Sequence, residues 1–340
     1  MLQRRTTLTL GLYSLAAAAL PRPAHAITSR TGPSRRGGAG DVGRIRETTA
    51  AFGRLDDLYG GGHARGAVAA YLAGDVAPLL RGTTGRARPA LLTAAAQLAY
   101  LAGWMSADMV RTGLAQRYYI MAVRLADEAG DDLMRSTVLR SLAVHAVELG
   151  HHRVGRDLAD AAADGIRAGS PARTRAWITG MCAEASAAAT HDQRRAHTLL
   201  RTAETELEHA DSRPDDAVTG NYRRESFSHQ VGLTLTHLGD LSGAEEHLAA
   251  SVDSRRPVER RTRALIGARL ALTQLNRQRP DVAARTVLNL RDDLSGVESR
   301  RVHQTLSKIR TGWRDATTDD PIGEADRLLA TLAGTGRPGR

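Results

Sequence analysis

Apolar residues recur at intervals of three and four along most of the chain, which is the spacing of one face of an α-helix. Segments of about fifteen to twenty residues with this pattern alternate with short breaks rich in Gly, Pro, Asp or Ser. The pattern predicts a leading helix pair at 41–58 and 64–80, split by Gly60, Gly61 and Gly62. We expect these glycines to form a tight structural turn, because glycine adopts backbone conformations closed to other residues.

Further pairs follow along the chain. Their first helices are predicted at 88–110, 131–149, 171–189, 217–238, 258–277 and 298–316. Their second helices are predicted at 114–129, 152–168, 193–210, 241–253, 281–294 and 322–333. A small residue lies early in each second helix: Ala115, Gly155, Ala196, Ala244, Ala284 and Ala325. The successive intervals of 40, 41, 48, 40 and 41 residues indicate a repeat somewhat longer than the roughly 34 residues of a tetratricopeptide motif.

This repeat predicts an all-α fold, a tetratricopeptide-like superhelix of about seven antiparallel helix pairs. A small residue in each second helix would let two helix backbones approach closely. In such a superhelix the first helices line an extended concave surface, which is where a ligand or partner would bind.

Composition narrows the class of protein further. The chain has 340 residues, of which 42% are apolar but only 4% aromatic, so the core is built from Leu, Ala and Val. The single cysteine, Cys182, excludes a disulfide framework and a cysteine-based zinc site, and a small buried residue is the simplest interpretation of it. No apolar stretch reaches the roughly 18 residues of a membrane span.

The net charge of +10 invites a nucleic-acid interpretation, but its distribution weakens it. Residues 1–46 carry eight arginines against Asp41 alone, and the rest of the chain holds 39 basic and 36 acidic residues. The body is therefore close to neutral. A solvated helical surface explains its charges better than a DNA-binding face does.

The first 26 residues have two interpretations. Arg4 and Arg5 precede a weakly apolar stretch at 8–20, and Ala24-His25-Ala26 fits a small-x-small cleavage site. This resembles a twin-arginine export signal with cleavage after Ala26, except that Thr7 stands where a bulky apolar residue is usual. The alternative is a linker from an upstream domain.

Three segments result from these patterns. Residues 1–40 are a disordered linker or signal-like segment, 41–335 are the helical-repeat domain, and 336–340 are a disordered tail.

Candidate chemistry is weak. Residues 38–43 match the glycine pattern of dinucleotide-binding loops, but no strand precedes them. The pairs Glu148/His151 and Glu206/His209 have the spacing of di-iron ligands, yet both lie at predicted helix ends, where exposed polar residues are the simpler interpretation. No catalytic constellation emerges, so we expect no enzyme, no cofactor and no metal.

The candidate groove residues are those of the first helices and their ends: Trp104, Asp108, Arg111, Trp177 and Trp313. The tryptophans have core positions as their alternative interpretation. Asp108 and Arg111 have a salt bridge on the helix surface as theirs.

Three sequence boxes resemble a known family: 55–65 (LDDLYGGGHAR), 71–82 (YLAGDVAPLLRG) and 101–118 (LAGWMS continuing to GLAQRY). They are similar to the C-terminal half of actinobacterial transcriptional regulators that carry an N-terminal Cro/C1-type helix-turn-helix before a tetratricopeptide-like domain. This chain shows no helix-turn-helix of its own. The resemblance therefore implies DNA contact only through a separate or missing helix-turn-helix.

Together these features predict a cytoplasmic, non-catalytic regulatory module that binds a protein, a peptide or a small-molecule signal, with a homodimer as a further option. The alternative is an exported helical-repeat protein that acts outside the membrane.

Overall fold

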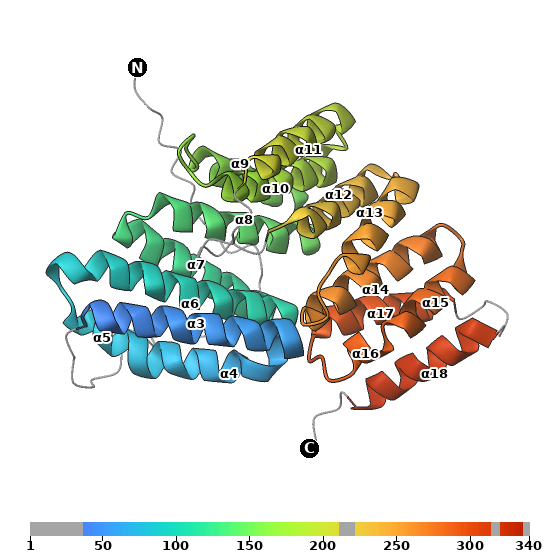
Figure 1. Ribbon diagram of the computed structural model, residues 1–340, viewed down its shortest axis with the longest axis horizontal. Coiled ribbons are helices and arrows are strands. Elements are labelled where there is room, and N and C mark those ends of the chain that lie inside the picture. Colours follow the sequence, from blue (N-terminus) through green and yellow to red (C-terminus); the bar gives the residue numbers. More distant parts are fainter. Residues whose placement is uncertain (1–36, 211–221, 314–319, 336–340) are drawn as a thin grey trace.

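The computed structural model describes residues 37–210, 222–313 and 320–335, which fold into helices without a strand in these ranges (Figure 1). The signal-like segment Met1–Ala26 and the tail 336–340 lie outside the described residues. The prediction of an all-α fold is confirmed for the described part of the chain.

The helices follow one another with short connections. In chain order they are α3 (Ala39–Tyr59), α4 (Gly61–Tyr71), a π-helical turn (Leu72–Val76), α5 (Ala77–Gly82), a 3-10 turn (Gly85–Ala87), α6 (Arg88–Asp108), α7 (Thr112–Ala129), α8 (Asp132–Glu148), α9 (His152–Asp164), α10 (Ala172–Thr190), α11 (Gln193–Glu208), α12 (Arg224–Leu238), α13 (Leu241–Asp253), α14 (Arg260–Asn276), α15 (Pro280–Asn289), α16 (Arg291–Leu294), α17 (Arg300–Gly312) and α18 (Asp320–Thr335).

Most predicted helices agree closely with these bounds, but the helix predicted at 64–80 is divided by the π-helical turn Leu72–Val76, and two others differ. The helix predicted at 217–238 begins at Arg224, after extended backbone at Arg223. The helix predicted at 281–294 is broken at Leu290, whose backbone leaves the helical conformation. The Leu290 side chain packs so closely on Gly267 of α14 that a Cβ there would meet it at 2.5 Å. This tertiary contact is invisible to the local periodicity.

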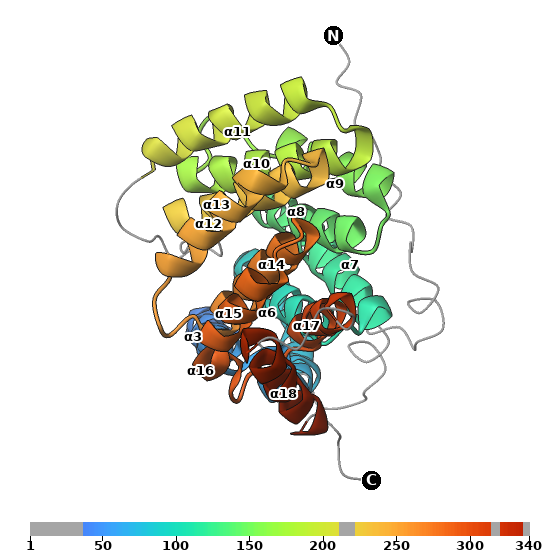
Figure 2. The same cartoon turned by 90° about the vertical axis from the view of Figure 1, so that its right-hand side faces the viewer.

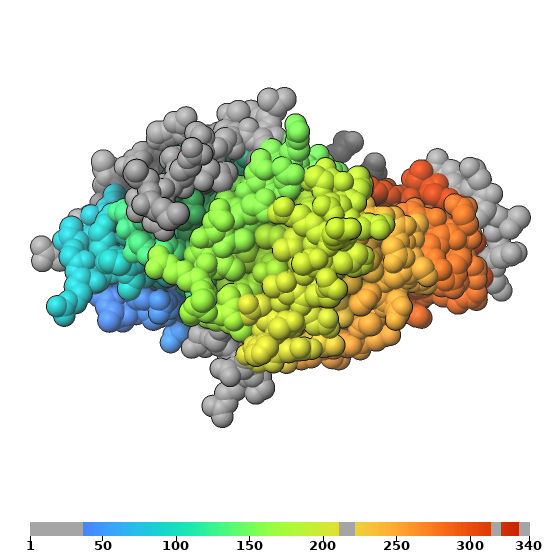
Figure 3. Space-filling view, turned by 90° about the horizontal axis from the view of Figure 1, so that it is seen from above, coloured from blue at the N-terminus to red at the C-terminus, as the bar shows by residue number. Residues whose placement is uncertain are grey.

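Consecutive helices pack as neighbouring pairs: α6 with α7, α8 with α9, α10 with α11, α12 with α13, and α14 with α15. The first helices of the successive pairs, α6, α8, α10 and α12, also contact one another in turn. Helix α14 contacts α13 on one side and α17 on the other (Figure 2). From above, the segments follow one another in chain order from α6 to α15 (Figure 3).

The small residues of the second helices lie where the pairs pack. Ala115, Ala196, Ala244, Ala284 and Ala325 are fully buried. A Cβ on Gly155 of α9 would lie 2.5 Å from Val147 of α8. The spacing therefore identified residues of the packed interior.

The core consists of one large apolar cluster across α3–α10 and smaller clusters in the later helices. The segment Gly85–Asp108 is apolar and long enough to span a membrane, judged by length and composition alone. It is a central helix here, and 72% of its apolar window is buried inside the protein.

The beginning and the end of the helix array meet. Helix α3 contacts α14, and α6 contacts α17. The Gly62 amide donates to the Glu298 carbonyl at 3.0 Å, and the Glu298 amide donates to the Tyr59 carbonyl at 2.7 Å. The carboxylate of Asp108, which is fully buried, accepts from the Gly61 amide at 3.0 Å and from the Ser299 hydroxyl at 2.8 Å.

We call this set of residues, Tyr59–Gly62 with Asp108, Glu298 and Ser299, the closure contact. It joins the leading helix pair to α17 and turns the array into a closed ring. The first helices of the pairs therefore surround a partly open interior, and the glycines of the closure contact let distant backbones touch.

Candidate functional site

A cavity of about 230 Å³ lies inside the ring. Its walls come mainly from α6, α8, α10, α12, α14 and α17, which are the first helices of their pairs. The lining is dominated by charged and hydrogen-bonding side chains: Asp57, Arg140, Glu148, Glu184, Tyr222, Ser226, His229, Gln230, Arg255, Glu259, Arg261, Thr262, Arg269 and Arg301. Such a wall offers hydrogen-bond donors and acceptors to a polar ligand, alongside the apolar faces of Trp104 and Trp177.

Trp104 defines the end of the cavity beside the closure contact. Two guanidinium groups face its indole ring: the Cζ of Arg261 lies 5.4 Å and that of Arg301 5.3 Å from the ring centroid. These are cation–π distances. Arg261 also pairs with the buried Asp56, Nε to Oδ2 at 3.2 Å, and its Nη2 lies 3.5 Å from Asp57 Oδ1.

Asp56 and Arg261 differ in how readily each loses its charge. Burial raises the pKa of Asp56 to about 6, opposed by Arg261 and reinforced by the negative charges of Asp108 and Asp57. Burial also disfavours the charge of Arg261, but the three carboxylates outweigh it and raise the Arg261 pKa. The guanidinium stays charged, and Asp56 is the group of this pair that can titrate near neutral pH.

Glu148 links two arginines in the middle of the cavity. Its Oε1 lies 2.7 Å from Arg269 and its Oε2 3.3 Å from Arg301. Burial disfavours the carboxylate, but the two arginines outweigh it and lower the pKa of Glu148. Arg269 also lies 2.7 Å from His229 Nε2, and burial keeps the pKa of that histidine well below its ordinary value. His229 is therefore neutral and accepts this hydrogen bond.

Arg255 and Glu259 form a further buried pair at 3.0 Å, beside the start of α14. The second terminal nitrogen of Arg255 donates to the Ser226 hydroxyl at 3.0 Å. This part of the wall is thus internally neutralised.

Trp177 marks the opposite end of the cavity. The Cζ of Arg140 stacks 4.3 Å from its ring centroid, and Arg140 Nη2 donates to the Gln230 side-chain oxygen at 2.9 Å. The amide nitrogen of Gln230 in turn donates to Glu184. Tyr222 completes this end and, like Arg140, Gln230 and Glu184, is buried, whereas Trp177 is half-buried.

The structure places the predicted groove residues in three different environments. Trp104 and Trp177 line the cavity together. Asp108 lies in the closure contact, where both oxygens are occupied, and no ion pair joins it to Arg111 among the described residues. Trp313 is 3% exposed and belongs to the apolar core of the C-terminal helices.

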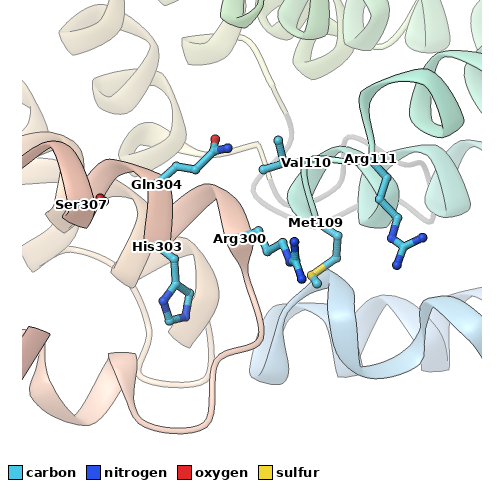
Figure 4. A pocket seen from close by; sticks show the side chains of 7 residues that line it. All are labelled: Met109, Val110, Arg111, Arg300, His303, Gln304 and Ser307. Atoms are coloured by element: carbon cyan, nitrogen blue, oxygen red, sulfur yellow. The ribbon is translucent and has the colours of Figure 1, made fainter. Parts of the chain in front are cut away.

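Arg111 lies outside the ring interior, at a separate surface pocket of about 430 Å³. Met109, Val110 and Arg111 line it from the turn between α6 and α7, and α17 supplies the other wall with Arg300, His303, Gln304 and Ser307 (Figure 4). Arg111, Arg300 and Gln304 are exposed, so these side chains are hydrated without a ligand. The pocket is larger than the cavity but offers no buried polar group that needs a partner.

The sequence interpretation missed the charged residues of the cavity, although a four-residue spacing along two helices indicates them. Arg140, Val144 and Glu148 follow one another at intervals of four along α8, and Arg261, Leu265 and Arg269 do so along α14. This spacing places each set on one helix face. Glu148 does lie at a helix end as expected, but its carboxylate belongs to the cavity.

The arrangement is suited to binding. Aromatic faces, guanidinium groups and carboxylates surround a small polar space, whereas the described residues hold no group of three or more His, Cys, Asp or Glu that could bind a metal ion. In comparisons with known proteins, no family model and no curated protein sequence matches the chain.

Proposed function

We propose that this chain is a non-catalytic, tetratricopeptide-like module that binds a small molecule inside its ring of helix pairs. The observation that carries the proposal is the polar cavity between Trp104 and Trp177. Its volume of about 230 Å³ lies below the roughly 300–1,000 Å³ of pockets for drug-sized ligands, so a small metabolite fits better than a peptide or a folded partner.

The same geometry supports a regulatory role. The cavity is bounded by both ends of the helix array, so a ligand that bridges its walls favours the closed ring over an opened one. A ligand shifts such an equilibrium by its differential affinity for the two states. In the family that the sequence boxes resemble, this module would be the sensory part of a transcriptional regulator, with DNA contact through a separate or missing helix-turn-helix.

Tryptophan fluorescence tests the binding step. The chain has three tryptophans, two in the cavity and Trp313 in the core. A Trp313→Phe variant therefore reports on the cavity alone. We expect a member of a panel of small carboxylates, phosphates, sugars or amino acids to change the fluorescence emission of this variant. The same ligand should raise the melting temperature, because at a hundredfold excess over Kd it adds about 2.7 kcal/mol to the free energy of unfolding.

A cavity-filling variant provides the control. Thr262→Phe places a bulky ring in the cavity wall, whereas Thr198→Phe makes the same change on the exposed face of α11. Binding should be lost in the first variant and kept in the second. A panel without any binder, or binding that survives Thr262→Phe, would contradict the proposed function.

A further inference from the structure

Arg140 differs from every other arginine of the cavity. Arg255, Arg261, Arg269 and Arg301 each form an ion pair with a carboxylate. Arg140 is 8% exposed, and no carboxylate of the described residues forms an ion pair with it. A buried charge without a counter-ion in direct contact is costly, and Glu184, whose charge acts on Arg140, forms no direct ion pair with it.

The neutral side chain of Gln230 lies between Arg140 and Glu184. The Gln230 amide accepts a hydrogen bond from Arg140 with its oxygen and donates one to Glu184 with its nitrogen. Gln230 thus occupies the place that a direct Arg140–Glu184 contact would need. Burial also raises the pKa of Glu184, which weakens Glu184 as a counter-ion.

Two hydrogen-bonding groups at this end of the cavity have no partner among the described residues. One is Nε of Arg140, and the other is the hydroxyl of Tyr222, a residue that is 6% exposed. Both residues line the cavity. Both can donate a hydrogen bond, so each suits an oxygen acceptor.

We propose that Arg140 is the anion subsite of the cavity and that it takes the carboxylate or phosphate group of a small polar molecule. Trp177 covers one face of the guanidinium, which leaves its edges for the in-plane contacts that such oxyanions make with arginine. The neutralised groups Glu148, Arg269 and His229 would bind the polar remainder of the ligand. The inference rests on the proposed function and specifies its ligand.

Simple probes test this subsite. The full chain is titrated with sodium acetate, with inorganic phosphate and with sodium chloride at matched ionic strength, and the readouts are the melting temperature and the fluorescence of the Trp313→Phe variant. We expect saturable binding of acetate or phosphate beyond the chloride response. Binding of acetate alone identifies a carboxylate site, and binding of phosphate alone a phosphate site.

Matched variants assign the effect to Arg140. Arg140→Gln removes the charge, and Arg135→Gln makes the same change on α8 where the arginine pairs with Asp127 outside the cavity. Anion affinity should fall at least about tenfold in the first variant and stay unchanged in the second. Tyr222→Phe removes only the hydroxyl, so it provides a second test if Arg140→Gln fails to fold. It should weaken anion binding several-fold.

The outcomes separate this inference from the proposed function. Acetamide is a neutral analogue of acetate. Suppose that acetamide binds as well as acetate, that Arg140→Gln changes neither affinity, and that Thr262→Phe blocks both. The cavity is then a ligand site, but the anion subsite is wrong. Equal curves for acetate, phosphate and chloride would also overturn the subsite. If acetate, phosphate and acetamide all fail to bind, the anion subsite is wrong, and the wider panel of sugars and amino acids then decides the proposed function.

Discussion

At the scale of single residues, glycine decides whether the ring can close. Gly60 has a positive φ of 86°, and a Cβ there would lie 2.7 Å from the Glu298 carbonyl oxygen. A Cβ on Gly62 would lie 2.8 Å from a carboxylate oxygen of Glu298. The glycine run predicted a tight turn from local chemistry. The backbone that approaches it comes from the far end of the chain, which no local pattern encodes.

Gly60→Ala should therefore destabilise the protein by about 1–3 kcal/mol, because it adds both backbone strain and a clash with Glu298. Gly53 in α3 is the matched control, since a Cβ there meets nothing within 4 Å. Gly53→Ala should stabilise the helix by up to about 1 kcal/mol. Denaturant unfolding measures both variants, and equal effects would argue against the closure contact.

His145 should make stability depend on pH. Burial lowers its pKa to about 4, while nearby Glu148 opposes the shift. Below about pH 6.5 the unfolded chain takes up a proton that the folded protein excludes, so stability falls, by about 2 kcal/mol at pH 5. Asp56 acts with the opposite sign: its raised pKa means that protonation below about pH 6 favours the folded state.

Unfolding curves measured across this pH range check the histidine. His145→Gln should flatten the decline in stability on acidification, and His197→Gln on the exposed face of α11 serves as the surface control. The same slope in wild type and His145→Gln would show that His145 does not resist protonation.

Cys182 should report unfolding. It is 5% exposed, its Sγ donates to the Ala159 carbonyl at 3.3 Å, and burial raises its pKa to about 12. Since the thiolate is the reactive form, a thiol reagent at about pH 8 should leave the folded protein unmodified and label it only on unfolding. Rapid labelling of the native protein would place this thiol in an accessible site instead. The sequence interpretation of Cys182 as a small buried residue is confirmed.

At the scale of elements, periodicity and the Gly, Pro, Asp and Ser breaks predicted most helix bounds. Second helices such as α9 and α11 bury one apolar stripe, whereas the first helices α6 and α8 are buried over most of their surface. Periodicity also led to Trp104 and Trp177, since first helices face the ring interior. It failed for Arg140, because a charged residue inside an apolar run does not by itself reveal whether it faces solvent or an internal cavity. Only the packing of α8 against α10, and the hydrogen bond from Arg140 to Gln230 of α12, decide that.

Close packing of the pairs should be sensitive to side-chain size at one position per second helix. Ala244 of α13 is fully buried, whereas Ala250 of the same helix is exposed. Ala244→Leu should cost about 1–3 kcal/mol through overpacking. The identical change at Ala250 should stay within about 0.5 kcal/mol. Thermal unfolding compares the two, and similar losses would contradict the assigned pairing of α12 with α13.

At the scale of the whole molecule, the closure contact joins the array of helix pairs into a ring that surrounds the cavity. The cavity walls come from helices spread along the whole described chain, so the site exists only while its two ends touch. Asp108 connects both sides through Gly61 and Ser299. Asp108→Asn leaves one of these donors without an acceptor, which should cost about 1–3 kcal/mol and open the ring.

Amide hydrogen exchange at Gly62 and Glu298 tests this account most directly, because these two amides bond across the closure contact. Both should be protected in the wild-type protein, exchange faster together in Asp108→Asn, and remain protected in Asp132→Asn, which removes a charge from an exposed surface pair with Arg167. A carboxylate or phosphate that binds the cavity should slow their exchange further. If both amides of the wild-type protein exchange as fast as those of exposed loops, the ring is open in solution and the cavity between its first helices does not exist.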